Sequence, residues 1–435
     1  MQRDWVGASF DARAKRNQAA PDAVVPPAFG IVHENTDAFR RRAACECLDL
    51  LGTLRTHREP QAGEAWRVPT ASERRLVAQL QAVLVLGPPA LEQAQCLALD
   101  PDVPDGDHVF ASLLALTSTT GTDYVQRCIP LFAAAVQRDR TEATAAVEAL
   151  CLSPSQAVAD ALAPLLKHVN VAVRAAAVRV LSYRGELATS PWCEAVSDAD
   201  PRVVLPALGG ALQRVDRSMA EAVLKPLYIH DSEALARAAL RAGMALALPS
   251  ALQAARALAA TTPAWADALY LVALLGQPQD QRMLEAAMSQ HLSVAAHACA
   301  RAGWLPLGSR LIAILAGQPA DTRAATDVAF ALSTLASCTL DPTSAPEAWA
   351  RIWIDATRVL DLGLRHRHGR PLGLREMANE LRTSLLSRPQ RQELYFEMQV
   401  LAQGRLPRFN AFDFIGRQHD DLDRLDAFLA APNGA

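Results

Sequence analysis

Two short stretches of the chain hold residue types that bind metal ions in proteins. The first contains Cys45 and Cys47, and the second contains His291, His297 and Cys299. On a helix, residues two positions apart point about 200° away from each other, so neither Cys45 with Cys47 nor His297 with Cys299 can share one ion. We therefore predict no metal site and assign these residues to structural positions.

The common catalytic motifs are absent from the sequence. There is no glycine-rich phosphate loop, no G-x-S-x-G turn that would carry a nucleophile, and no H-E-x-x-H zinc motif. The ten histidines are spread along the whole chain. We therefore predict that the protein is not an enzyme, has no catalytic residue and needs no cofactor.

Arginines are the residues most suited to hold an acidic partner. Seven of them fall within residues 174–241, at Arg174, Arg179, Arg184, Arg202, Arg214, Arg237 and Arg241. This concentration indicates either a solvated surface with salt links or a groove for phosphate groups or an acidic protein. The partner-binding candidates that we take from this group are Arg174, Arg179, Arg202, Arg237 and Arg241.

A second basic group is the stretch RHRHGR at 365–370. Its cations lie where the C-terminal dipole of the preceding helix would favour them, or they form an exposed basic knuckle for an acidic partner. The candidates from this group are Arg365, Arg367 and Arg370.

Four tryptophans are either core residues or anchors of a binding face. They are Trp265, Trp304, Trp349 and Trp353. A tryptophan exposed on a concave face would be a strong anchor for a protein partner. We include Trp265 among the partner-binding candidates.

The composition of the 435-residue chain favours an all-helical fold. Apolar residues make up 51% and aromatic residues 5%, and alanine is abundant whereas strand-favouring residues are sparse. The formal net charge of −3 gives no overall attraction for nucleic acid or anionic lipid. Because no long uncharged apolar run and no secretory leader occurs, we expect a cytoplasmic protein with reduced cysteines and no membrane partner.

Small apolar residues recur every 30 or 31 positions through the middle of the chain. They form three columns, four residues apart: Ala143, Val173, Val203, Ala234, Ala264, Val294 and Ala324; Val147, Ala177, Ala207, Ala238, Ala268, Ala298 and Val328; Cys151, Leu181, Ala211, Ala242, Val272, Ala302 and Leu332. Residues at i, i+4 and i+8 share a helix face, where alanine lets neighbouring helices approach closely. Two helices in about 30 residues form an α-hairpin, and hairpins in series predict an α-solenoid.

Residues of the types that cap helices recur with the same period. In the first set, Asn170, Asp200, Asp231, Thr261 and Asp321 are of these types and His291 takes the remaining place; the second set is Ser250, Asp280 and Ser309. The turns between paired helices place a set of polar residues along one edge of the predicted superhelix: His168, Asp198, Asp200, His230, Asp231, His291 and Asp321. This edge serves either for capping and solvation, or as a surface that is pH-sensitive or binds a basic partner.

The stretches HVNVAVR at 168–174 and DADPRVV at 198–204 resemble the turn and second-helix start of HEAT-type repeats in their short form. The resemblance covers about residues 110–335. The arginine that usually follows the valine is present at Arg174, whereas Val204, Leu235 and Trp265 occupy the equivalent places. The resemblance implies an all-α fold, a HEAT-like solenoid of stacked helical hairpins.

The ends of the chain differ from the repeats. We expect a flexible lead over 1–27, an N-terminal helical region over 28–109, the array over 110–340 and a C-terminal helical cap region over 341–435. Thr70 and Glu73 have the spacing of a capping box, and Gly87 would end that helix. The last helix would cover the final apolar face of the array, or act as a detachable docking helix.

These ends carry a second resemblance. The stretches IVHENTDAFRRRA, RVPTASERRLVAQLQAVLVLG and HRHGRPLGLREMANELRTSLLSRPQRQELYFEMQVLAQG are similar to an uncharacterised proteobacterial family of helical-repeat proteins. Members are often encoded near type VI secretion genes and their spike or effector cargo. Together with the repeats, the likeness spans nearly the whole chain and implies a role in that setting.

The resulting hypothesis is a non-enzymatic scaffold that binds another protein, as an adaptor or chaperone accessory to a type VI secretion spike or effector. One alternative is an immunity protein that neutralises a toxin by occluding its active site. The other is a helical-repeat protein that binds nucleic acid, favoured only by the arginines of residues 174–241.

The repeat register makes a prediction about stability. Replacing Ala238 or Ala268 with leucine should lower the free energy of unfolding by about 1–3 kcal/mol, because the larger side chain overpacks a helix crossing. Thermal unfolding of the two variants measures the effect, and unchanged midpoints in both would refute the register.

Overall fold

The computed structural model is all-helical and describes residues 36–431, apart from 62, 99–104, 211, 213, 263–264, 318–321 and 384. The described residues form 22 α-helices, three short 3-10 helices and one small β-hairpin. The expected lead at 1–27, and the repeat positions Ala211, Ala264 and Asp321, lie outside the described residues. None of the described helices is long and apolar enough to cross a membrane.

The chain divides into two compact units, each assembled from three separate segments. Unit 1 consists of residues up to 214 with 385–390 and 408–423, and unit 2 consists of 215–384 with 391–407 and the residues from 424 onward. The helices of the first segment of unit 1 are α2 (Thr36–Thr56), α3 (Thr70–Leu86), α4 (Pro88–Leu97), α5 (Gly106–Thr117), α6 (Thr122–Arg138), α7 (Arg140–Leu152), α8 (Ala157–Leu162), η1 (Ala163–Lys167), α9 (Val171–Arg184), α10 (Thr189–Val196) and α11 (Pro201–Leu208).

Unit 2 contains a longer series of helices and the β-hairpin. Its elements are α12 (Arg217–Leu224), η2 (Lys225–Ile229), α13 (Glu233–Ala245), α14 (Pro249–Thr261), α15 (Ala266–Leu275), η3 (Pro278–Asp280), α16 (Gln281–Gln290), α17 (Leu292–Ala302), α18 (Leu305–Ala316), α19 (Thr322–Ala336), α20 (Pro346–Thr357), β1 (His366–Arg367), β2 (Arg370–Pro371) and α21 (Leu374–Thr383). The last two helices, α22 (Arg388–Leu401) and α23 (Ile415–Ala430), contribute residues to both units.

Two of the predicted caps are confirmed. The side chain of Asn170 accepts a hydrogen bond from the N–H of Ala172 at the start of α9, and Asp200 accepts one from the N–H of Arg202 at the start of α11. These carboxylate and amide oxygens satisfy N–H groups that the first turn of a helix leaves without a partner. Gly87 ends α3, as expected.

Other predicted caps are wrong, because the helices begin one or several residues away. Ser232 rather than Asp231 precedes α13, and Thr261 is the last residue of α14. Asp280 does precede a helix, but its side chain does not cap it. Ser250 and Ser309 lie inside α14 and α18.

The capping box predicted at the start of α3 is also wrong. Pro69 precedes that helix without a side-chain cap, and Thr70 is its first residue. Glu73 is instead buried, where it accepts a hydrogen bond from the N–H of Ile415. The sequence spacing predicted that Glu73 caps its own helix. Its carboxylate instead binds a residue far away in the sequence.

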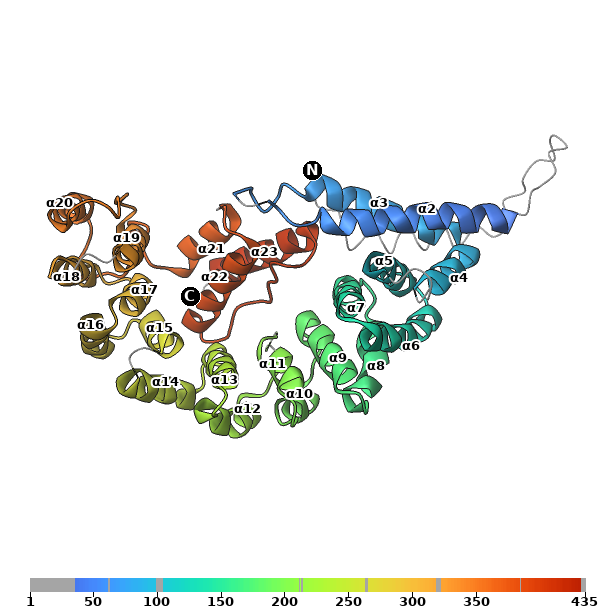
Figure 1. Cartoon of the computed structure of the whole chain (residues 1–435), viewed down its shortest axis with the longest axis horizontal. Helices are drawn as coiled ribbons and strands as arrows, with labels where there is room; N and C mark the ends of the chain where they lie inside the picture. Colours follow the sequence, from blue (N-terminus) through green and yellow to red (C-terminus); the bar gives the residue numbers. More distant parts are fainter. Residues whose placement is uncertain are drawn as a thin grey trace. The chain divides into compact units, whose positions relative to one another are not determined.

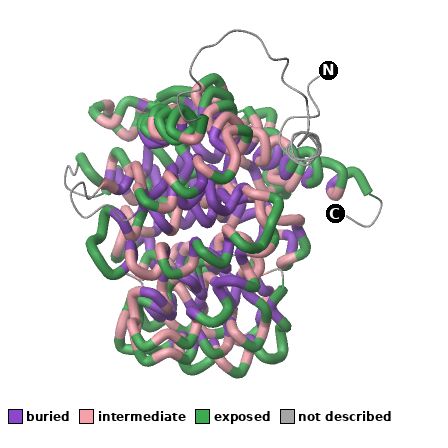
Figure 2. The backbone as a smooth tube through the Cα atoms, turned by 90° about the vertical axis from the view of Figure 1, so that its right-hand side faces the viewer, coloured by how far each residue is buried: buried purple, intermediate pink, exposed green. Residues whose placement is uncertain are grey.

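Within each unit, every second helix packs against the next in sequence order (Figure 1). In unit 1 these contacts run from α5 to α7, α9 and α11, and in unit 2 from α13 to α15, α17 and α19. We call these helices the inner helices of their unit. The helices between them pair with a sequence neighbour: α6 with α7, α10 with α11, α14 with α15, α16 with α17 and α18 with α19. Figure 2 shows the buried residues (purple) running through the helices and many exposed residues (green) at the outer turns.

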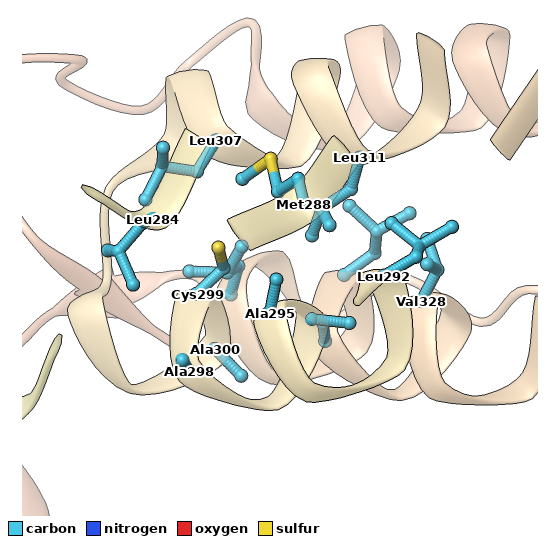
Figure 3. Packing of buried hydrophobic residues seen from close by; sticks show 14 of the residues in the cluster. Leu284, Met288, Leu292, Ala295, Ala298, Cys299, Ala300, Leu307, Leu311 and Val328 are labelled. Atoms are coloured by element: carbon cyan, nitrogen blue, oxygen red, sulfur yellow. The ribbon is translucent and has the colours of Figure 1, made fainter. Parts of the chain in front are cut away.

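The core of unit 2 illustrates how small side chains pack. Figure 3 shows Leu284 and Met288 of α16, Ala295 and Cys299 of α17, and Leu311 of α18 meeting in one cluster. At the end of the unit, a methyl group on Gly308 would lie within about 2.6 Å of the ring of Trp353. Since no side chain separates them, α18 and α20 approach each other closely there.

The predicted register holds in most of the helices concerned, but in α7 and α13 its first two positions are not buried: in α7, Ala143 and Val147 are only half-buried. Val173, Ala177, Ala207 and Ala268 are fully buried, as expected. In α13, Ala234 is exposed and Ala238 only half-buried, whereas the next residues, Leu235 and Ala239, are buried; Ala242 is buried as expected. The helix is turned by one residue from the periodic register, because it begins after Ser232 rather than Asp231.

This shift makes a second prediction. Ala239→Leu should lower the free energy of unfolding by about 1–3 kcal/mol, because Ala239 has no exposed surface and the leucine has no space. Ala238→Leu should cost less, since part of its side chain faces solvent. Denaturant unfolding of the two variants compares them, and an equal or larger loss in Ala238→Leu would contradict the shifted register.

Candidate functional site

Three successive inner helices of unit 2 each extend one polar side chain to helix α22. Arg241 of α13 donates a hydrogen bond to Glu393 at 2.6 Å, and Arg301 of α17 lies 3.1 Å from Glu397. Between them, Tyr270 of α15 donates to Glu393 at 2.6 Å and also lies 3.0 Å from Glu397. The two carboxylates on one face of α22 thus connect residues 391–401 to three inner helices, α13, α15 and α17.

The β-hairpin at 366–371 extends this network. Arg367 donates to Glu397 at 2.6 Å and to both carboxylate oxygens of Glu380 in α21. His368 lies beside Glu380 as well. We call the set Arg241, Tyr270, Arg301, Arg367, Glu380, Glu393 and Glu397 the unit 2 ion cluster.

The charges of this cluster shift the pKa values of Glu380 and Glu393. Burial alone would raise the pKa of Glu380, but the contacts with His368 and Arg367 outweigh it and lower the pKa to about 2. Burial likewise opposes ionisation of Glu393, and Arg241 together with the hydrogen bond from Tyr270 lowers its pKa. Burial and the two carboxylates raise the pKa of Tyr270. At neutral pH both acids are therefore ionised and Tyr270 keeps its proton.

Aromatic contacts add to the hold on α22. The guanidinium of Arg241 lies over the ring of Phe396, 3.9 Å from its centroid, and that of Arg301 lies over the ring of Tyr270. A cation over an aromatic face is attracted by the ring quadrupole, more strongly where water is excluded. Arg241 therefore recognises both an acidic and an aromatic residue of the same helix.

Arg365 binds the ends of two inner helices. Its guanidinium donates to the carbonyls of Leu274 and Leu275 in the last turn of α15, and to those of Arg301 and Ala302 in α17. Such carbonyls have no partner within their own helix and form the negative end of its dipole. Burial lowers the pKa of Arg365 to about 10, so it remains charged at neutral pH.

A comparable network in unit 1 is more deeply buried. Arg58 and Glu73 are each only 2% exposed, and the Nε atom of Arg58 lies 3.4 Å from a carboxylate oxygen of Glu73. Arg58 also donates to Glu148 of α7, and Arg388 donates to the carbonyl of Arg58. Burial raises the pKa of Glu73 more than the charges of Arg58 and Arg388 lower it.

Residues 408–423 complete this network. Arg408 donates to the carbonyl of Tyr183 in α9 at 2.7 Å, and Arg58 lies over the ring of Phe414. The buried carboxylate of Asp413 is close to Arg408 and Arg417. The C-terminal residues of unit 1 are therefore held against its inner helices by charge, as they are in unit 2.

Most of the predicted partner-binding arginines already have acidic partners in the chain. Arg174 forms two hydrogen bonds with Asp198, and Arg202 forms two with Asp200. Arg237 contacts Glu233 and Asp267. Arg241 and Arg367 belong to the unit 2 ion cluster. Arg365 binds the carbonyls at the ends of two helices. Arg184, at the end of α9, donates to the carbonyls of Leu150, Ser153 and Ser155. The paired residues thus have structural contacts, and their role in partner binding stays a prediction.

Two of the candidates remain open to solvent. Arg179 and Arg370 are exposed and form no ion pair or side-chain hydrogen bond within the described ranges. Trp265 is half-buried, and its indole N–H donates to Glu233. Trp349 and Trp353 are buried in the core, whereas Trp304 donates to the carbonyl of Gly276.

His297 and Cys299, considered above as possible metal ligands, lie in different environments. His297 is exposed and contacts Asp327, whereas Cys299 is buried. In the turns, His168 and His230 accept hydrogen bonds from the N–H groups of Asn170 and Ser232. Across the residues that the structure describes, no group of three or more histidine, cysteine or acidic residues is placed to hold a metal ion.

Sequence reasoning missed the residues that organise both networks. Glu393 and Glu397 are four positions apart and so share one face of α22, which was the only local signal available. Their partners lie 152 and 96 positions away, at Arg241 and Arg301. The burial of Arg58 and Glu73 could not be read from the sequence, since charged residues are usually exposed and Glu73 fitted a local capping box.

The unit 2 ion cluster predicts an unequal cost for two conservative substitutions. Glu397→Gln should lower the free energy of unfolding by about 2–3 kcal/mol, because it leaves the half-buried Arg301 and Arg367 with less compensating charge. Glu233→Gln is the control: Glu233 is 63% exposed, and its loss should cost less than about 1 kcal/mol. Urea unfolding measures both, and equal losses would show that the cluster does not stabilise the unit.

Comparison with known sequences gives no assignment: no protein-family model matches the chain, and no curated protein matches it significantly.

Proposed function

We propose that the protein is an α-solenoid of HEAT-like hairpins that binds another protein and catalyses no reaction. The order of helix contacts supports this, since within each unit each inner helix packs against the next one in the sequence. Stacked hairpins of this kind offer an extended surface to which each repeat contributes a few side chains.

The observation that carries the proposal is the way in which unit 2 holds α22. Arg241, Tyr270 and Arg301 come from three successive inner helices and together bind one acidic, aromatic helix face. Binding of a helix through regularly spaced side chains is a common mode of peptide recognition. Inner helices that hold one helical segment of their own chain have the chemistry to hold a segment of another protein.

The setting of the proposal comes from the family resemblance of the sequence. We place the protein in the cytoplasm as an adaptor or chaperone accessory to a type VI secretion spike or effector. In this proposal its partner is the spike or effector polypeptide, and the exposed residues Arg179 and Arg370 contribute to the contact. Exposed cations of this kind accelerate association with an acidic partner more than they raise affinity.

A role in nucleic-acid binding has less support than protein binding. Arg174, Arg202 and Arg237 are each paired with an aspartate, which neutralises the charge that phosphate groups would require. An immunity protein remains within the same proposal as a special case, in which the bound polypeptide is a toxin.

The experiment is co-purification of the tagged, full-length chain with the spike and effector proteins encoded by its neighbouring genes. We expect a stable complex with one of them, and an association rate about tenfold lower for the double variant Arg179→Glu with Arg370→Glu. Arg282→Glu, an exposed residue of α16, is the matched control and should bind like the unmodified protein.

Two outcomes decide between the roles. Rescue of growth when a toxic partner is co-expressed identifies an immunity protein, and a complex without rescue identifies an adaptor. If none of the neighbouring gene products binds, the secretion setting is wrong.

A further inference from the structure

Helix α20 of unit 2 and the residues that follow it expose an unusual amount of apolar surface. Among the described residues, five of the sixteen exposed large hydrophobic side chains lie within 352–364: Ile352, Ile354, Val359, Leu362 and Leu364. Ile354 is 63% exposed and Val359 80% exposed. Single exposed hydrophobic residues are ordinary, but a concentrated group marks an interaction surface.

The same helix has one face buried and the other fully open. Trp349 and Trp353 pack into the core against α18 and α19, on the side of α20 opposite Arg351 and Asp355. The outward face consists of Glu347, Arg351, Ile354, Asp355 and Arg358, all of them exposed. Because these positions follow the 3.6-residue period of a helix, they form one continuous stripe.

The four charges of this stripe alternate in sign along the helix. Within the described part of the chain, none of Glu347, Arg351, Asp355 and Arg358 forms an ion pair or a side-chain hydrogen bond. By contrast, most of the other arginines discussed above are paired with an acid or with helix carbonyls. The stripe therefore offers both signs of charge around an exposed isoleucine.

We propose that this stripe, the outward face of α20 defined by Glu347, Arg351, Ile354, Asp355 and Arg358, is a dimer interface that binds the same stripe of a second copy of the chain in antiparallel orientation. The order of the charges carries the proposal. About a two-fold axis near residue 353, Arg351 faces Asp355 of the second copy and Glu347 faces Arg358, and symmetry makes each contact twice.

The apolar residues fit the same arrangement. With about 1.5 Å of rise per residue, Ile354 lies close to the axis and meets Ile354 of the second copy at the centre of the interface. The other exposed hydrophobic residues, Ile352, Val359, Leu362 and Leu364, would surround that centre. A central apolar contact within a polar rim is the usual anatomy of a protein interface.

Other occupants fit the stripe less well. A membrane surface or a nucleic acid requires an excess of positive charge, whereas this face carries two acids and two bases. A surface whose own charges complement one another after a two-fold rotation is best matched by itself.

The first experiment measures the mass of the full chain by sedimentation as its concentration rises from about 1 to 100 µM. The dissociation constant of a dimer with a small interface is expected in this range. We expect a rise from 46.7 kDa toward twice that value. Ile354→Asp, Arg351→Glu and Asp355→Arg should each shift the midpoint of this rise at least about tenfold upward in concentration, because each places a like charge or a buried charge at the interface. Arg282→Glu on α16 is the control and should leave the midpoint unchanged.

A mixing experiment tests the pairing itself. Arg351→Glu and Asp355→Arg chains should each be monomeric, yet a one-to-one mixture should form a heterodimer, because the new glutamate faces the new arginine. Thermal unfolding of each variant confirms that it is folded. A monomer at every concentration would overturn the proposal. So would a dimer whose stability is unchanged by the charge reversals, or a mixture of the two variants that does not associate.

Discussion

Ion pairs between partly or fully buried arginines and carboxylates hold the C-terminal segments of this protein in place. In unit 2 they join Arg241, Arg301 and Arg367 to α22, and in unit 1 they join Arg58 to Glu73 and Glu148. Removing a charge from water costs several kcal/mol, which only a well-placed partner offsets. The pairs therefore contribute less to overall stability than to the choice of one arrangement, since any other leaves a charge buried alone.

The alanine-rich helices explain why ion pairs, rather than apolar packing alone, hold the C-terminal segments. Ala177, Ala207, Ala239 and Ala268 bury little surface each, so the packed helices approach closely but gain less from apolar burial than leucine-rich helices would. The close contact between Gly308 and Trp353 likewise depends on a small residue. A core built from small side chains sets the spacing of the helices, and the long arginines reach across the remaining distances.

Features that depend on neighbouring residues could be predicted from the sequence, whereas contacts between distant residues could not. Helices, most of the repeat register and the caps Asn170 and Asp200 follow from local spacing. The one-residue shift in α13 could not be foreseen, because the spacing favoured Asp231 as the cap although the helix begins after Ser232. The partners of Arg241 and Arg58 could not be found either, since nothing in a single sequence joins residues that far apart.

The division of the chain has a consequence for its synthesis. Unit 1 needs residues 408–423, which emerge only after all of residues 215–384 have been made. At the usual rate of about 5–20 residues per second, synthesis takes roughly 16–70 s from Glu73 to Arg388 and Ile415. During that interval the nascent chain has the charged residues Arg58 and Glu73 but not the C-terminal residues that contact them in the finished protein.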